Sequence, residues 1–184
     1  SGEQVFQIAS ESFTNDHLLK LGQRVSALAK QADVDGIVIT HGTDTAEETG
    51  FLIDLTLPTD KPVILVGAMR PADAVGADGM RNFANAVKVA SDGQASGRGV
   101  MLVMGDAVLS ARDARKAATS AIDAFRSFPR GPLARVTPST LDWFGPPHRL
   151  DKTGAGQAAR GSMPAPDSAP VGWHWRNRPR CRQA

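Results

Sequence analysis

Hydrophobic positions in the first part of the chain follow two different spacings. Between residues 15 and 28 the apolar residues recur every three or four positions, which predicts an amphipathic helix capped by Asn15 or Asp16. Residues 36–40 instead form a continuous, largely β-branched run, which is typical of a strand buried on both faces. The pattern therefore predicts a helix that leads into a buried strand.

The same alternation continues to about residue 104. Helices are expected after Thr45, which has capping-box spacing to Glu48, and over residues 79–91. In the second of these helices one side carries Phe83, Val87 and Ala90. The further expected strands are residues 5–9, 62–66 and 99–104. Strand, loop and helix in repeated succession predict an α/β domain with a largely parallel sheet.

Three polar clusters fall where loops are expected to follow strands. They are residues 10–12, residues 40–44 and the Gly-, Pro- and Asp-containing loop of residues 67–78. Ligands of parallel α/β sheets bind at the carboxyl ends of the strands, where such loops gather. A binding or catalytic site is therefore expected among these clusters.

The charge is unevenly distributed along the 184 residues. The chain has 21 Lys and Arg against 19 Asp and Glu, and its pI is near 9.0. Residues 1–150 contain 15 basic and 17 acidic residues, whereas residues 151–184 contain 6 and 2. The larger part lacks the basic surface that a nucleic-acid partner requires, so no such partner is expected. No apolar run reaches the roughly 18 residues of a membrane-spanning helix, and a single cysteine excludes an internal disulfide.

Composition divides the chain at about residue 150. Residues 1–149 carry the periodic pattern of one domain. Residues 151–184 contain four prolines and five arginines, and among Ile, Leu, Val and Phe they contain Val171 alone. Such a segment cannot bury enough apolar surface to offset its ordering entropy, so residues 150–184 are expected to be a disordered or non-homologous basic tail. The first residues show no basic and apolar regions of a signal peptide, and none is expected in this chain.

Thr43, Asp44 and Lys116 are candidates for chemistry, although each has a structural alternative. Thr43 and Asp44 lie between a buried strand and a helix start, where positive potential suits a carboxylate or an oxyanion. Helix capping is the commoner role of such residues. Lys116 could serve as a base or proton relay if burial lowered its pKa, but its charged surroundings are also typical of a solvated turn.

Ser10, Glu11 and His41 form a second group of candidates. A hydroxyl beside a carboxylate can hold the two charged groups of an amino acid, although Ser and Glu also occur in ordinary turns. His41 could act as a general base, or it could hydrogen-bond within its loop. The other histidines do not have metal-ligand spacing.

Several blocks of this sequence resemble the bacterial type II L-asparaginases. Residues 36–45 read Gly-Ile-Val-Ile-Thr-His-Gly-Thr-Asp-Thr, and Glu47-Glu48-Thr49 follows in the same register. Residues 61–71, residues 77–79 with Asn82, residues 105–116, and residues 125–127 with 131–133 continue the resemblance, which covers about residues 1–149. Residues 7–12 are most similar to the glutaminase-asparaginase branch.

The resemblance implies an amidohydrolase that converts L-asparagine, and in this branch L-glutamine, to the acid and ammonia. It also implies a three-layer αβα domain, a threonine-based acyl-enzyme, no metal or cofactor, export to the periplasm or medium, and a homotetramer. By position, Thr43, Asp44 and Lys116 would form the catalytic triad. Ser10 would bind the α-carboxylate, Glu11 and Asp44 the α-ammonium group, and the backbone of Ala68 would lie against the side-chain amide.

Three departures from the family pattern bear on activity. The family's first strand, with its Thr-Gly-Gly-Thr motif and usual nucleophile, is not found, the chain has no tyrosine, and residues 150–184 do not resemble the C-terminal domain. The chain is therefore expected to be poorly active or inactive by itself. The alternatives left open are a non-catalytic amino-acid-binding remnant and a product that neither binds nor reacts.

Overall fold

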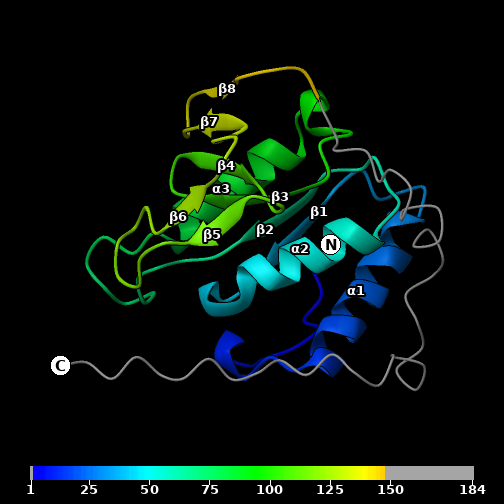
Figure 1. The fold of residues 1–184 in the computed structure, drawn as a ribbon, viewed down its shortest axis with the longest axis horizontal. Coiled ribbons are helices and arrows are strands. Elements are labelled where there is room, and N and C mark those ends of the chain that lie inside the picture. The colour runs from blue at the N-terminus through cyan, green and yellow to red at the C-terminus, as the bar shows by residue number, and fades with distance from the viewer. Residues whose placement is uncertain (1, 148–184) are drawn as a thin grey trace.

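The computed structural model describes residues 2–147, and the predicted tail of residues 150–184 lies outside them (Figure 1). The helices are α1 (Asn15–Ala29), α2 (Ala46–Thr56) and α3 (Gly79–Ala90), with short 3-10 turns η1 (Ser10–Ser12), η2 (Thr43–Thr45) and η3 (Gly93–Ala95). The strands are β1 (Ile37–Thr40), β2 (Val63–Val66), β3 (Val100–Met104), β4 (Ala107–Ser110), β5 (Ala114–Lys116), β6 (Phe125–Ser127), β7 (Ala134–Val136) and β8 (Leu141–Trp143).

Six of these strands form one mixed sheet in the order β1-β2-β3-β4-β7-β8. The pairs β1–β2 and β2–β3 are parallel, and the remaining pairs of this sheet are antiparallel. The expectation of a largely parallel sheet thus holds for β1 to β3, where helices cross over between strands. It fails from β4 onward because β3 and β4 are joined by a tight turn at Gly105, whose φ of 59° suits glycine. Strands β5 and β6 pair separately as an antiparallel ribbon.

Alternation along β2 divides the core between the two faces of the sheet. Val63 and Leu65 pack with α1 and α2, whereas Ile64 and Val66 pack with α3. All four side chains are at most 2% exposed, so each contributes about 1.5–3 kcal/mol through burial. Helices α1 and α2 lie on one side of the sheet and α3 on the other, which gives residues 2–147 the expected three layers (Figure 1).

The three predicted helices form, but their details differ from the prediction. Helix α1 is capped by Thr14, whose backbone N–H donates to Nδ1 of His17 at 3.2 Å, and not by Asn15 or Asp16. The capping box expected at Thr45 does not form, because the Thr45 hydroxyl donates to the carbonyl oxygen of Ser10 at 2.9 Å. In α3 the side with Phe83 and Val87 stays exposed, and the buried residues are Asn82, Asn85, Ala86 and Val89.

The strand predicted over residues 5–9 is wrong. A strand needs a neighbour for its backbone groups, and this segment lies outside the sheets formed by residues 2–147. Phe6 packs edge-on against Phe13 and His17 instead, and Val5 and Ile8 are 38% and 41% exposed. No helix within residues 2–147 combines the length and the apolar character needed to cross a bilayer.

Candidate active site

The loops that follow β1 and β2 meet at Gly67. A Cβ atom on Gly67 would lie 2.7 Å from the carbonyl oxygen of His41 and 3.1 Å from Cγ2 of Thr43. Backbone atoms cannot yield at that distance, so the close approach of the two loops requires glycine here. Two of the three predicted polar clusters are thereby brought into contact at the carboxyl ends of adjacent parallel strands.

The third cluster, on η1, reaches the same place without a strand before it. The Oγ atom of Ser10 accepts a hydrogen bond from the backbone N–H of Asp44 at 3.2 Å, and Ser10 is 5% exposed. A Cβ atom on Gly42 would lie 2.4 Å from Ser10 Oγ, so Gly42 leaves the space that Ser10 fills. Ser10 is thus a buried part of the site, whereas Glu11, the next residue of η1, is exposed.

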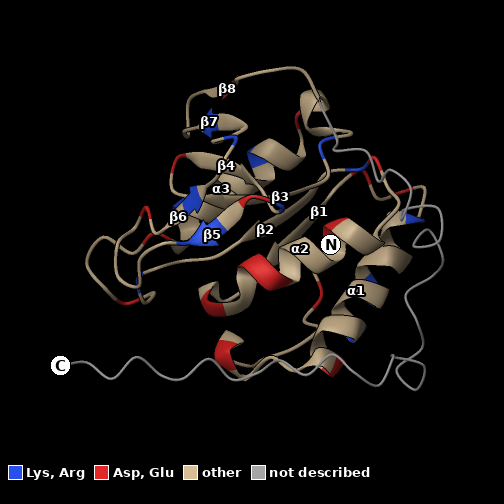
Figure 2. Cartoon of the chain, in the orientation of Figure 1, with Lys and Arg blue, Asp and Glu red and all other residues tan. Residues whose placement is uncertain are grey.

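Lys116 joins this cluster from more than 70 residues along the chain. Its Nζ atom donates to Oγ1 of Thr43 at 2.8 Å and to Oδ1 of Asp44 at 2.6 Å. The Lys116 side chain is 16% exposed, whereas that of Asp44 is 53% exposed and opens to solvent. Figure 2 shows the acidic positions of η1 and the start of α2 at the same end of the molecule as the basic positions of β5 and β6. Lys116 is therefore not in the solvated turn considered above but at the end of β5.

Two acidic residues of α2 hold the segment that carries Lys116. Oε2 of Glu47 accepts a hydrogen bond from the backbone N–H of Lys116 at 2.6 Å. Asp54, which is 3% exposed, pairs with Nε of Arg112 and also accepts from the backbone N–H of Val100 at 2.8 Å. Spacing along the sequence predicts a role for neither acid, because their hydrogen-bond partners lie far away in the chain.

Asp78 shapes the loop that contains Ala68. Its carboxylate accepts hydrogen bonds from the backbone N–H groups of Met69 and Arg70 at 3.0 Å each, and from Nδ2 of Asn82 at 2.9 Å. Burial raises the pKa of the Asp78 carboxyl, but these hydrogen bonds outweigh burial and leave the pKa below its ordinary value. The exposed Ala68 is thereby fixed through its neighbour Met69.

His41 makes its contacts within its own loop, with helix α2 and with Phe13. Its Nδ1 donates to the carbonyl oxygen of Gly42 at 2.7 Å, and its Nε2 lies 3.1 Å from the hydroxyl of Thr49. Its ring also contacts Phe13 edge-on. Burial lowers the pKa of His41, so the neutral ring is favoured. Among residues 2–147, no three His, Cys, Asp or Glu side chains are grouped so that they could hold a metal ion.

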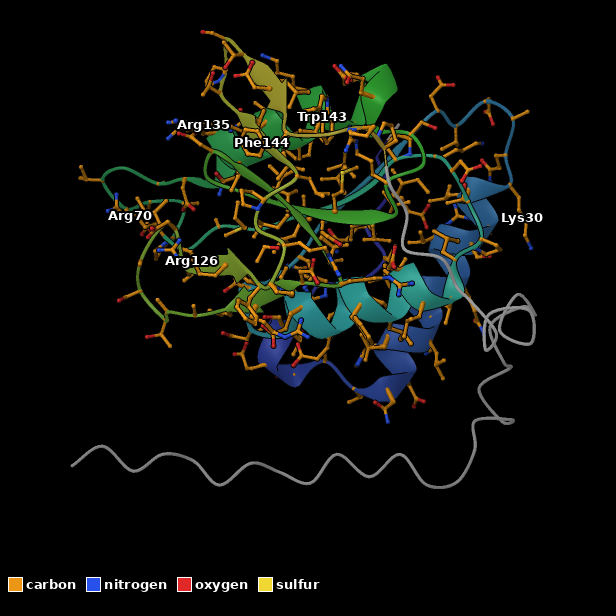
Figure 3. All side chains as sticks on the ribbon, turned by 45° about the horizontal axis from the view of Figure 1, so that its top comes forward. Lys30, Arg70, Arg126, Arg135, Trp143 and Phe144 are labelled. Atoms are coloured by element: carbon orange, nitrogen blue, oxygen red, sulfur yellow. The ribbon has the colours of Figure 1, made fainter. Side chains whose placement is uncertain are left out.

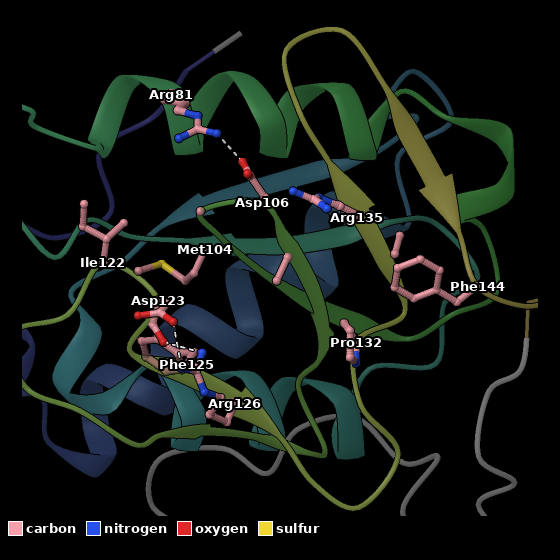
Figure 4. Close-up of a pocket in the computed structure, with 13 residues that line it drawn as sticks. Arg81, Met104, Asp106, Ile122, Asp123, Phe125, Arg126, Pro132, Arg135 and Phe144 are labelled. Carbon is pink, nitrogen blue, oxygen red and sulfur yellow. Dashed lines mark hydrogen bonds and ion pairs between the residues drawn. The ribbon is translucent and has the colours of Figure 1, made fainter.

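A separate pocket of about 430 Å³ lies between β4, β7 and β6 (Figure 4). Its floor is apolar, with Met104 and Phe125, and ion pairs at its rim join Arg81 to Asp106 and Arg126 to Asp123. Arg70, Arg126 and Arg135 project from one end of the molecule, and Lys30 lies at the opposite end (Figure 3). None of the residues around Lys116 Nζ lines this pocket.

A model of the Asparaginase, N-terminal family matches residues 1–149, which is most of the chain. The chain belongs to the asparaginase family. The resemblance inferred from the sequence blocks is therefore confirmed, together with the α/β class of the fold.

The relatives of this asparaginase-family chain are named as glutaminase-asparaginases or L-asparaginases. It is 56% identical over 146 residues to a glutaminase-asparaginase of Pseudomonas aeruginosa, which covers 79% of this chain and 40% of the relative. It is 43% identical over 148 residues to L-asparaginase 2 of Escherichia coli, covering 80% and 42%. A probable periplasmic L-asparaginase of Haemophilus influenzae is 47% identical over 142 residues, covering 77% and 40%. The chain thus spans about two fifths of the length of these relatives.

Proposed function

We propose that this chain contributes the catalytic cluster of an amidohydrolase that converts the side-chain amides of L-asparagine and L-glutamine to acids and ammonia. The observation that carries the proposal is the pair of contacts from Lys116 Nζ to Thr43 and Asp44. A hydroxyl, an amine and a carboxylate in hydrogen-bonded series form the arrangement in which a nucleophile is activated by a neighbouring base. The names of the relatives supply the substrate class.

The series allows a proton to leave the Thr43 hydroxyl without a net change of charge on Lys116. Lys116 takes the hydroxyl proton across 2.8 Å while its own proton passes to Asp44 across 2.6 Å. The oxygen of Thr43 then attacks the amide carbon, and the carbon–nitrogen bond breaks as ammonia leaves with a proton returned through Lys116. Water hydrolyses the resulting ester, which frees Thr43 and the acid product.

The charged groups at the open side of the cluster suit an amino acid. The Ser10 hydroxyl accepts from Asp44 N–H and still has its own hydrogen to donate to a substrate carboxylate. The exposed carboxylates of Glu11 and Asp44 would bind the α-ammonium group. The backbone at Ala68 would face the side-chain amide, held in place by the Asp78 hydrogen bonds to the next two residues.

Export and assembly are further parts of the proposal. Because one relative is named as periplasmic, we place the activity in the periplasm or outside the cell. We also propose a homotetramer as the active assembly, and poor turnover by residues 1–184 alone, since they span two fifths of the relatives' length. Sedimentation velocity of the purified chain would show the assembly.

The test is ammonia release from L-asparagine and L-glutamine by the unaltered chain and by Lys116→Met. Loss of a proton relay lowers turnover by about 10²–10⁴-fold, so release is expected to be slow in the unaltered chain and lower by about that factor in the variant. Lys20→Met, on the exposed side of α1, is the matched control and should match the unaltered chain. Equal release by Lys116→Met would reject the proposal. Saturable binding of L-aspartate without any ammonia release would favour a non-catalytic amino-acid-binding role.

A further inference from the structure

Lys116 enters the site from a strand that has little support of its own. Strand β5 has three residues, and within residues 2–147 it pairs with β6 alone, with Lys116 opposite Phe125. The next residue, Ala117, donates its N–H to Ala124 across the ribbon at 2.7 Å. In an antiparallel ladder successive N–H groups point to opposite sides, so the N–H of Lys116 points out of the ribbon.

Glu47 is the acceptor of that outward N–H, at 2.6 Å. It lies in the first turn of α2, three residues after Asp44, where a negative side chain is favoured by the helix dipole. The same turn of chain therefore provides one carboxylate for the ammonium group of Lys116 and another for its backbone. The two contacts fix both ends of the lysine to one piece of backbone.

A second contact shows that α2 holds the whole segment. Asp54 lies two turns further along α2 and pairs with Arg112, four residues before Lys116. Residues 112 and 116 are thus bonded to opposite ends of α2. Asp54 secures the beginning of the segment, and Glu47 secures the residue whose side chain enters the site.

We propose that Glu47 is a positioning residue that sets the place of Lys116 Nζ between Thr43 and Asp44 through the Lys116 backbone. The inference rests on the proposed function for its catalytic consequence, but the contact itself can be tested without turnover. Without the Glu47 acceptor, the Lys116 N–H loses its partner and β5 can shift relative to α2. A misplacement on the order of 1 Å costs about 10²-fold in rate when reacting groups must be aligned.

The first experiment measures hydrogen exchange of backbone amides by NMR in the unaltered chain, Glu47→Ala and Glu47→Gln. In Glu47→Ala the Lys116 amide should exchange about tenfold faster or more, while the Ala117 amide, bonded to Ala124, keeps its protection. Glu47→Gln should retain part of the protection, because the amide oxygen of glutamine still accepts a hydrogen bond. Unchanged exchange at Lys116 in Glu47→Ala would overturn the proposal, and so would an equal loss at every amide.

The second experiment measures ammonia release with the same variants. Glu47→Ala should lower kcat by about tenfold to 10²-fold with little change in KM, and Glu47→Gln should recover most of kcat. Glu3→Gln, which breaks an exposed pair with Arg24, is the matched control and should leave both constants unchanged. A kcat of Glu47→Ala equal to that of the unaltered chain would overturn the positioning role. Absence of ammonia release from the unaltered chain, with Lys116 protection lost in Glu47→Ala, would reject the proposed function and leave Glu47 as a fastening of β5.

Discussion

Replacement of Asp78 by asparagine should destabilise the loop that shapes the site. The two carboxylate oxygens of Asp78 accept from the backbone at Met69 and Arg70 and from Nδ2 of Asn82. In Asp78→Asn one oxygen becomes an NH₂ group. Asn82 cannot turn to accept from it, because Oδ1 of Asn82 already accepts from Gly105 N–H at 3.1 Å. The new NH₂ group must therefore face the N–H group of Met69, Arg70 or Asn82, each of which is also a donor.

The size of the effect follows from the bonds that are lost. Hydrogen bonds to a charged group contribute about 1.5–3 kcal/mol each, and the substitution removes the charge and at least one bond. We expect the free energy of unfolding to fall by about 2–4 kcal/mol near neutral pH. Asp73→Asn, at an exposed position of the same loop, should change it by about 0.5 kcal/mol or less.

The pH dependence separates this explanation from a simple packing defect. The pKa of Asp78 is lowered in the folded chain, so its contribution is present above the pKa of the unfolded chain and is lost as the pH falls through the folded pKa. The difference between the unaltered chain and Asp78→Asn should therefore be constant near neutral pH and shrink between about pH 5 and pH 2. Urea unfolding followed by circular dichroism at several pH values measures it. A difference that stays constant over that range would refute the reasoning.

Three other predictions concern residues around the sheet. Gly67→Ala should lower the free energy of unfolding by about 2 kcal/mol or more in urea unfolding, since its Cβ would meet His41 O at 2.7 Å, whereas Gly93→Ala, with open space around it, should cost about 1 kcal/mol or less. Burial lowers the pKa of His41, so the unfolded chain takes up the proton first and the free energy of unfolding decreases as the pH falls below about 6.5. His41→Gln should flatten this dependence of the unfolding free energy on pH, and an unchanged dependence would contradict the buried, neutral state of His41. Arg98 lies 3.9 Å above the Trp143 ring and donates to the carbonyls of Gln94 and Gly145, so it holds β8 in place. Arg98→Ala should lower the melting temperature and increase proteolysis near β8, and an unchanged melting temperature would argue against this role of Arg98.

Hydrophobic spacing predicted the central part of the fold because burial there is decided locally. The runs that became β1, β2 and β3 are apolar at nearly every position, and sheet and helices cover both of their faces. The five short strands after Met104 were not predicted. They have three or four residues each, and in β5 and β6 charged side chains occupy half-buried or exposed positions. Their pairing depends on distant partners, which spacing does not reveal.

The candidate site shows the same division between local and distant information. Thr43 and Asp44 could be found because they follow a recognisable buried strand. Lys116 is one candidate from its own residues, but its surroundings are typical of a charged turn, and the family resemblance is what favours a catalytic role. Glu47 and Asp78 act through backbone N–H groups, which every residue except proline carries, so no residue type marks their partners.

The place where the amino acid binds can be measured most directly by NMR. Backbone amides of the assigned chain are followed while L-aspartate, the product of asparagine hydrolysis, is added to saturation. The account predicts saturable shifts gathered at Ser10, Asp44, Ala68 and Lys116, the residues that the loops and β5 bring together. Shifts confined to the pocket lined by Met104 and Phe125, or no saturable shift at all, would contradict it.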